Sequence, residues 1–207
     1  MNKYFLRLFG TLLCMVSTSS FSATVIFSDG FEGESGYGLN YSSFNNWDIT
    51  SGSVDLINQG SYSLSCVGNT GRCVDLDGSS NQAGTFSTKQ TFNLSPGTYE
   101  LSFALSGNQR NSSLDVVDVS MSSLFSTQIS KNGFDPYELF SFIITVNSPT
   151  STGITFTHQG VDNLGMMLDD VQLVSTVPVP GAVWLLGSGL ITLFGLSRRR
   201  GCAPHIC

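Results

Sequence analysis

Few residues of this chain could carry acid–base or nucleophilic chemistry. Its 207 residues include two histidines, His158 and His205. A Ser-His-Asp arrangement in the body of the chain would need His158 as its base, and no GxSxG phrase supplies a serine on a nucleophile elbow. Gln159 and Gly160 follow His158, which predicts that this histidine ends a strand at a turn. We do not expect it to be catalytic.

Carboxylates are the more numerous chemical groups. Glycoside hydrolysis needs two of them across a cleft at a defined separation. Asp75 and Asp77 share one face of a predicted strand because alternate residues of a strand point the same way, whereas Asp115 and Asp118 do not. No pair can be placed across a cleft from sequence, so an extracellular hydrolase is the least favoured function. The protein is not expected to be an enzyme.

Two cysteines in the middle of the chain suggest a disulfide. Cys66 and Cys73 enclose Gly68, Asn69 and Gly71, which can turn the chain. A hairpin with a disulfide across its neck is therefore reasonable, provided that the compartment is oxidising. A reduced pair or a metal site is the alternative, although two thiols without a nearby histidine make a poor zinc site.

Residues 1–22 have the layout of a secretory signal peptide. Lys3 and Arg7 give a basic start, residues 8–16 form a short apolar core, and small residues follow. We expect signal peptidase to cut after Ser22, or one residue later, and residues 23–176 to be exported.

The C-terminal segment has the features of one membrane-spanning helix. The stretch 177–196 is uncharged and is followed by Arg198, Arg199 and Arg200. At about 1.5 Å per residue it spans roughly 30 Å, the thickness of a hydrocarbon core. The arginine cluster should stop transfer and stay cytoplasmic. This predicts a transmembrane helix over 181–197, a cytoplasmic tail over 201–207 and inner-membrane anchoring before any processing.

The same segment resembles the PEP-CTERM sorting signal in its variant form beginning Val-Pro-x-Pro. The resemblance covers residues 177–200 and implies that an exosortase recognises and cuts the chain near the motif. The chain would be the substrate of that enzyme and would then be released or attached at the cell surface. The motif residues are Val177, Pro178, Val179, Pro180, Gly181 and Ala182.

Residues 23–176, which would remain after both ends are set aside, are strongly acidic. They hold all fifteen Asp and Glu residues of the chain, against four cations, for a formal charge of −11. Nucleic acids and anionic lipids would be repelled by such a surface. Cations and neutral polymers such as sugars are compatible partners. The four cations are Arg72, Lys89, Arg110 and Lys131.

The composition of this acidic region predicts an all-β sandwich. Ser, Thr, Gly and Asn punctuate apolar stretches about every eight to twelve residues. Within 97–106, Tyr99, Leu101, Phe103 and Leu105 share one face and are predicted core. The predicted strands are 24–27, 47–51, 53–57, 63–66, 73–75, 84–92, 97–106, 114–120, 125–129, 138–146, 153–157 and 166–174.

Three stretches of the region, 46–57, 74–110 and 164–174, resemble a jelly-roll domain common among PEP-CTERM proteins. They resemble more distantly the galactose-binding-like carbohydrate-binding modules, which often open on Gly-Phe-Glu and close on Asp-Asp-Val. Here these phrases are residues 30–32 and 169–171. The resemblance implies a jelly-roll antiparallel β-sandwich over 23–176.

The resemblance also implies a structural calcium ion. In these modules the opening and closing strands lie side by side and their acids hold the ion. Carried over by position, the ligands are Glu32 and Asp170, with Asp29 as a third oxygen source. The alternative is that these acids are solvated turn residues. No DxDxDG loop is present, so an EF-hand is excluded.

Sugar binding would need aromatic faces and hydrogen-bonding side chains. Trp47 is favoured as core, since it begins a strand. Arg110 is expected to pair with Asp115 or Asp118. The candidates are Tyr37, Tyr41, Phe44, Trp47, Tyr62, Asn108, Gln109 and Arg110.

The sequence thus orders three functions. An exosortase-sorted protein of the cell surface or extracellular matrix, with a non-catalytic β-sandwich, comes first. A carbohydrate-binding module for an extracellular polysaccharide comes second, and an extracellular hydrolase third.

Overall fold

The computed structural model describes residues 21–160 and 162–178, with side chains for 23–160 and 162–176. Ala23–Val177 form one compact unit. None of the helices among the described residues is long and apolar enough to cross a membrane.

The predicted sorting and export segments lie almost wholly outside these residues. This holds for the signal peptide up to residue 20, the transmembrane helix over 181–197, the arginine cluster and the tail. Phe21 and Ser22 belong to the first strand, and Val177 and Pro178 end the last.

Two antiparallel sheets form the body of the fold. The first contains β1 (Phe21–Asp29), β3 (Asp55–Asn58), β4 (Arg72–Asp75), β7 (Gly97–Ser106), β10 (Glu138–Val146) and β13 (Met167–Pro178). Its order is β10-β7-β13-β4-β3, and β1 also pairs with β13. The second contains β2 (Trp47–Ser51), β5 (Thr85–Thr88), β8 (Leu114–Met121), β9 (Phe125–Asn132) and β12 (Thr155–Gln159). Its order is β2-β5-β12-β8-β9.

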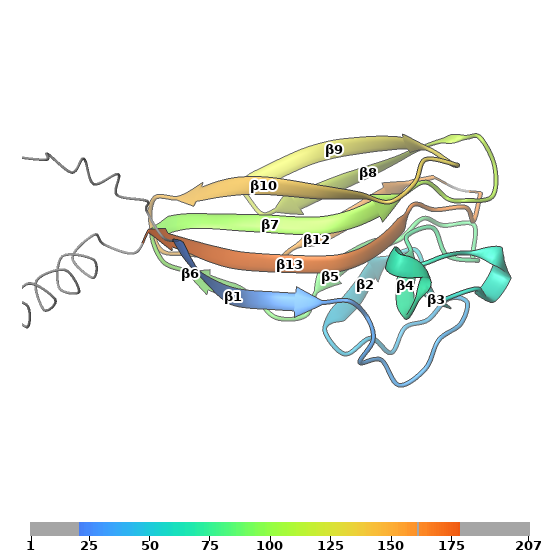
Figure 1. Cartoon of the computed structure of the whole chain (residues 1–207), viewed down its shortest axis with the longest axis horizontal. Helices are drawn as coiled ribbons and strands as arrows, with labels where there is room; N and C mark the ends of the chain where they lie inside the picture. The colour runs from blue at the N-terminus through green and yellow to red at the C-terminus, as the bar shows by residue number, and fades with distance from the viewer. Residues whose placement is uncertain (1–20, 161, 179–207) are drawn as a thin grey trace, which may run out of the picture. The chain divides into compact units, whose positions relative to one another are not determined.

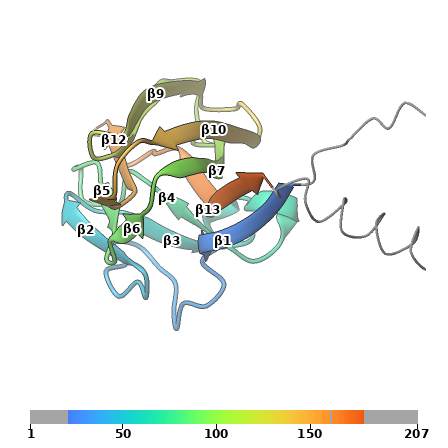
Figure 2. The ribbon, with the colours of Figure 1, turned by 90° about the vertical axis from the view of Figure 1, so that its left-hand side faces the viewer.

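The two sheets face each other as the layers of a β-sandwich (Figures 1 and 2). In Figure 2, β2, β5, β12 and β9 lie on one side and β10, β7, β13 and β1 on the other. Two short strands, β6 (Phe92–Leu94) and β11 (Thr150–Thr152), form a separate pair, and η1 (Ser61–Ser63) and η2 (Val67–Asn69) are 3-10 turns. The predicted all-β antiparallel sandwich is confirmed.

Alternation along β7 sets the core as predicted. Tyr99, Leu101, Phe103 and Leu105 are all buried, because the two-residue period of a strand sends them to the same face. Phe156 of β12 reaches the same core and meets the Phe103 ring edge-on at 5.1 Å between centroids.

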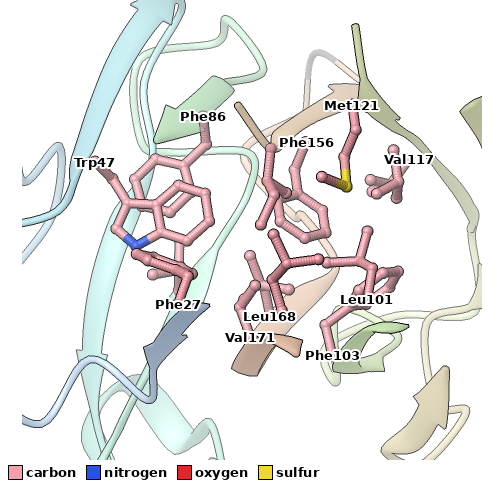
Figure 3. Close-up of a cluster of buried hydrophobic side chains, with 14 of the residues drawn as sticks. Phe27, Trp47, Phe86, Leu101, Phe103, Val117, Met121, Phe156, Leu168 and Val171 are labelled. Carbon is pink, nitrogen blue, oxygen red and sulfur yellow. The ribbon is translucent and has the colours of Figure 1, made fainter. Parts of the chain in front are cut away.

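An aromatic cluster fills one half of the core (Figure 3). Trp47 is fully buried and stacks on Phe86, with ring centroids 4.6 Å apart and an interplanar angle of 10°. Phe27 meets the indole edge-on at 5.5 Å. The indole Nε1 donates a 2.9 Å hydrogen bond to Asp29 Oδ2, which satisfies its polar atom. The prediction that Trp47 is a core residue is confirmed.

Two of the predicted strands are wrong. No strand forms over 63–66: Ser63 ends η1 and residues 64–66 belong to no strand, because Tyr62 and Ser63 adopt left-handed backbone angles, with φ of 54° and 61°, that interrupt the extended chain. Residues 84–92 divide into β5 and β6, since the chain leaves the second sheet after Thr88 to reach the separate β6–β11 pair. The alternation of apolar and polar residues does not show where the chain leaves one sheet and pairs with a strand of another.

The sandwich has two different ends. β1 begins and β13 finishes at one end, as Figure 1 shows. At the other lie the segments 59–71, 107–113, 133–137 and 162–166, which we call the loop end.

A bulge in β13 lies near the loop end. The pairing of β13 with β7 shifts between Asp169 and Gln172. Asp170 takes a left-handed φ of 50°, which Asp tolerates better than most residues. The bulge leaves Asp169 buried and Asp170 exposed.

Candidate ligand-binding site

A hollow of about 310 Å³ opens at the loop end. We call it the loop-end pocket. Three segments that are far apart in sequence supply its walls, namely the turns around η2, the segment after β7 and the loop between β9 and β10. The lining residues are Ser65, Cys66, Gly68, Asn69, Ser106, Gln109, Phe134, Asp135, Pro136 and Tyr137.

Direct backbone contact holds two of these walls together. Gly107 N donates to the carbonyl of Asp135 at 3.0 Å. A Cβ on Gly107 would lie 2.0 Å from the carbonyl oxygen of Asn132, and one on Gly133 would lie 1.9 Å from that of Asn111. Only glycine permits such an approach, so the pocket wall is fixed before any ligand arrives.

The two amide side chains expected to meet sugar hydroxyls instead brace the loops. Gln109 donates to the carbonyl of Ser65 through Nε2 and accepts from Ser65 N through Oε1, both at 2.8 Å. Asn108 is completely buried and donates to Asp115 Oδ2 at 2.8 Å. Both amides therefore serve the structure of the pocket.

A disulfide supports the floor of the pocket. Cys66 and Cys73 are bonded, with their Cα atoms 5.4 Å apart, and pack in a small apolar cluster that includes Met167 and contacts Tyr137.

Two carboxylates tie the disulfide hairpin to the ends of β1 and β13. Asp169 Oδ2 accepts from Val67 N at 3.1 Å, and Glu32 Oε1 accepts from Arg72 N at 2.9 Å. A Cβ on Gly71 would lie 1.7 Å from the same Glu32 oxygen and would displace this side chain, and the φ of 70° at this position also favours glycine.

The groups left to meet a ligand are an aromatic face and a few polar atoms. Phe134 is 66% exposed at the rim. Asn69 is exposed and Asp135 is half-buried. The hydroxyl of Tyr137 is buried and makes no hydrogen bond within the described residues. Burial, and then the negative charge of Asp169, raises the pKa of Tyr137, so this hydroxyl stays protonated and can donate.

Sequence reasoning missed Phe134 and Tyr137. The available signal was two aromatic residues beside Gly133 and Pro136, in a segment left between two predicted strands. An aromatic side chain in a turn has no sheet face to cover, so its exposure could have been suspected. That both residues line one pocket with Gln109 could not have been predicted, because the pocket forms only in the folded chain.

The predicted aromatic candidates lie elsewhere. Phe44 and Trp47 are buried in the core, and Tyr41 packs edge-on against Phe44 at 4.9 Å. Tyr37 and Tyr62 are 55% and 53% exposed but do not line the pocket.

A buried ion pair lies at the same end of the fold. Asp75 is completely buried, and its Oδ2 accepts from Arg110 Nη2 at 2.5 Å. The expectation that Arg110 pairs with Asp115 or Asp118 was wrong, because the loop after β7 folds back over β4. Burial raises the pKa of Asp75 to about 8, although the Arg110 charge opposes this rise.

Asp77 and His158 are buried in the same region. Asp77 is completely buried, so it and Asp75 do not face each other across an open cleft. His158 Nε2 accepts from Met166 N at 3.3 Å. Burial lowers the pKa of this imidazole to about 4, so it is neutral at pH 7. His158 is the penultimate residue of β12, and its predicted place at the end of a strand is confirmed.

The three acids predicted as calcium ligands are not arranged alike. Asp29 accepts hydrogen bonds from Phe31 N at 2.8 Å and from Trp47 Nε1, which commits it to the core. Asp170 Oδ1 lies 3.2 Å from the point where Gly30 would carry a Cβ. Glu32 interacts electrostatically with Asp169, as does Asp170.

Carboxylate oxygens therefore lie near one another where β1 and β13 meet, and oxygen is the donor type that calcium prefers. Among the described residues, however, no three Asp, Glu, His or Cys side chains converge on one point. Glu32 and Asp170 would need backbone carbonyls to complete a calcium site, and both carboxylate oxygens of Asp29, the third predicted oxygen source, already accept hydrogen bonds.

No protein-family model and no curated protein sequence matches this chain. Several solved structures are similar in fold. The family 61 carbohydrate-binding module TmCBM61, in complex with β-1,4-galactotriose, has 16% sequence identity and a TM-score of 0.42 over 63% of this chain and 88% of its own. The K1 cleaved adhesin domain of Lys-gingipain from Porphyromonas gingivalis W83 has 14% identity and a TM-score of 0.47 over 73% and 97%.

A third similar structure is the carbohydrate-binding module CBM6cm-2 from Cellvibrio mixtus lichenase 5A, in complex with cellotriose. Its identity is 11% and its TM-score 0.38, over 72% of this chain and 97% of that module. Similarities this distant concern the β-sandwich alone, and no ligand is transferred from them.

Proposed function

We propose that this protein is exported, sorted to the cell surface or extracellular matrix through its C-terminal signal, and binds an extracellular polysaccharide at the loop-end pocket. The observation that carries the binding role is the Phe134 ring, 66% exposed on the rim of a pocket whose walls are fixed by backbone contact.

The chemistry of the pocket suits a saccharide. Sugar rings have apolar faces that stack on aromatic side chains and hydroxyls that need hydrogen-bonding partners. Phe134 offers the face, while Asn69, Asp135 and Tyr137 offer polar atoms around it. A fixed wall lowers the entropy cost of binding, because few side chains must be ordered.

Export and sorting are supported by the residues at the two ends of the chain and by the disulfide. The Cys66–Cys73 bond suits an oxidising compartment. Signal peptidase and an exosortase would be the processing partners, and the motif 177–182 would be the cutting region.

Binding is tested with the purified protein on an array of polysaccharides, followed by calorimetry on those that bind. We expect Phe134→Ala to weaken binding about tenfold, since stacking on an aromatic ring contributes about 0.5–1.5 kcal/mol beyond its buried area. Tyr62→Ala is the matched control, because Tyr62 is similarly exposed but lies outside the pocket lining, and it should bind as the unmodified protein does. Absence of binding to every polysaccharide, or equal loss in both variants, would overturn the assignment.

A further inference from the structure

The loop-end pocket is negatively charged. Asp135 lines it directly. The Asp170 carboxylate also lies near enough to Tyr137, a lining residue, to act electrostatically on its hydroxyl. Asp75 adds no net charge because Arg110 pairs with it, and burial raises the pKa of Asp169 to about 7, so Asp169 is only partly charged at neutral pH. A negative group that entered the pocket would therefore meet charge of the same sign, chiefly that of Asp135.

No cation in the pocket lining offsets these charges. The guanidinium of Arg110 is held by Asp75, and Lys131 Nζ, 7% exposed, donates to Glu138 Oε2 at 3.1 Å. Arg72 Nη1 donates to the carbonyl of Glu34, and Lys89 Nζ to that of Phe44. These four are all the Lys and Arg residues between positions 23 and 176, so each is already engaged by another group.

We infer that the loop-end pocket selects uncharged polysaccharides and rejects those that carry uronate or sulfate groups. This inference rests on the proposed function and names the ligand class of the same pocket. Recognition of anionic sugars uses Arg or Lys to meet the charged oxygens, and the pocket supplies neither. The loss of solvation that a carboxylate suffers on burial would go uncompensated, whereas a neutral sugar can still stack on Phe134 and accept from Tyr137.

The test compares matched polymers on the purified protein. The probes are the neutral polysaccharide that binds most tightly in the array, the same polymer after oxidation of its primary hydroxyls to carboxylates, and polygalacturonate. We expect at least tenfold weaker binding of both anionic polymers at low salt, with the gap narrowing in 0.5 M salt because charges are screened.

A variant separates repulsion from the loss of a hydroxyl. Asp135→Asn keeps the shape of the side chain and removes its charge, so it should recover several-fold of the lost affinity for the oxidised polymer. Asp48→Asn, which removes an exposed charge on β2 outside the pocket, should recover none.

Equal or tighter binding of the anionic polymers would overturn this inference while leaving polysaccharide binding intact. A gap that neither salt nor Asp135→Asn narrows would also overturn it, since a missing hydroxyl would then explain the loss. If no polymer binds at all, the proposed function itself fails.

Discussion

Buried His158 makes the stability of the sandwich depend on pH. In the unfolded chain a histidine titrates near pH 6.5, whereas burial lowers the pKa of folded His158 to about 4. Between these values the unfolded chain binds a proton that the folded chain does not. Stability is therefore fully present above pH 6.5 and is lost as pH falls towards 4, by up to about 1.4 kcal/mol per pH unit.

His158→Gln isolates this contribution. Gln cannot be protonated, and its side-chain oxygen can still accept from Met166 N. We expect the difference in unfolding free energy, unmodified protein minus variant, to fall steadily from pH 6.5 to pH 4 in urea titrations. The raised pKa of Asp75 lowers stability as pH rises towards 8. Asp75 is present in both proteins, so its contribution cancels in the difference between their unfolding free energies. Parallel curves for the two proteins would contradict the prediction.

At the scale of single residues, the sequence showed which side chains alternate into the core but not which polar atoms were already in use. The faces of β7 and the burial of Trp47 follow from local period and residue type. The bonds of Gln109 to Ser65 and of Arg110 to Asp75 cross 44 and 35 positions. The partners of Gln109 and Arg110 depend on how the loop after β7 folds back, and sequence spacing does not predict the path of that loop.

At the scale of elements, strands were predictable where one strand stays in one sheet. Predicted 47–51, 97–106 and 138–146 match β2, β7 and β10 residue for residue. The failures came where the chain changes sheet, at β5 and β6, or turns through left-handed residues, at η1. The loop-end pocket could not be predicted for a similar reason. Its three walls are loops far apart in sequence, and they meet only in the folded chain.

We predict a calcium-binding site where β1 and β13 meet. Glu32 and Asp170 would supply two carboxylates there, with backbone carbonyls completing the site. A site of the affinity usual in extracellular modules, about 10⁻⁴–10⁻³ M, would stabilise the fold by about 1.4–2.7 kcal/mol in 10 mM calcium. We expect calcium to raise the melting temperature and a chelator to reverse the rise.

Asp170→Asn should abolish the calcium effect, and Asp48→Asn should keep it. Asp29→Asn should lower stability with or without calcium, because Asp29 holds Trp47 and the turn at Phe31. A melting temperature that neither calcium nor chelation changes would leave these acids as charged residues of the strand junction.

At the scale of the whole molecule, the pocket and the last strand's end lie at opposite ends of the sandwich. β7 has ten residues, roughly 30 Å at the rise of a strand. Ser106, where β7 ends, lines the pocket, whereas Tyr99 near its start pairs with Ser175 of β13. A chain tethered after β13 would therefore hold its pocket at the end away from the tether.

The sorting tail is the last prediction, and it concerns the full chain. In cells without an exosortase, we expect the full chain to remain in the membrane fraction after an alkaline carbonate wash, because the uncharged stretch 177–196 should span the bilayer. Co-expression of an exosortase should yield a shorter species, whose mass measured by mass spectrometry places the cut near residues 177–182.

A chain with alanine at Pro178 and Pro180 should stay uncut in the membrane, since it keeps the apolar stretch and loses only the motif. Replacing the three arginines with glutamine should weaken retention instead, because the stop-transfer charge is gone. Cleavage that proceeds equally well without the two prolines would show that the motif is not what the enzyme reads. Carbonate extraction of the uncut chain would show that the apolar stretch does not anchor it.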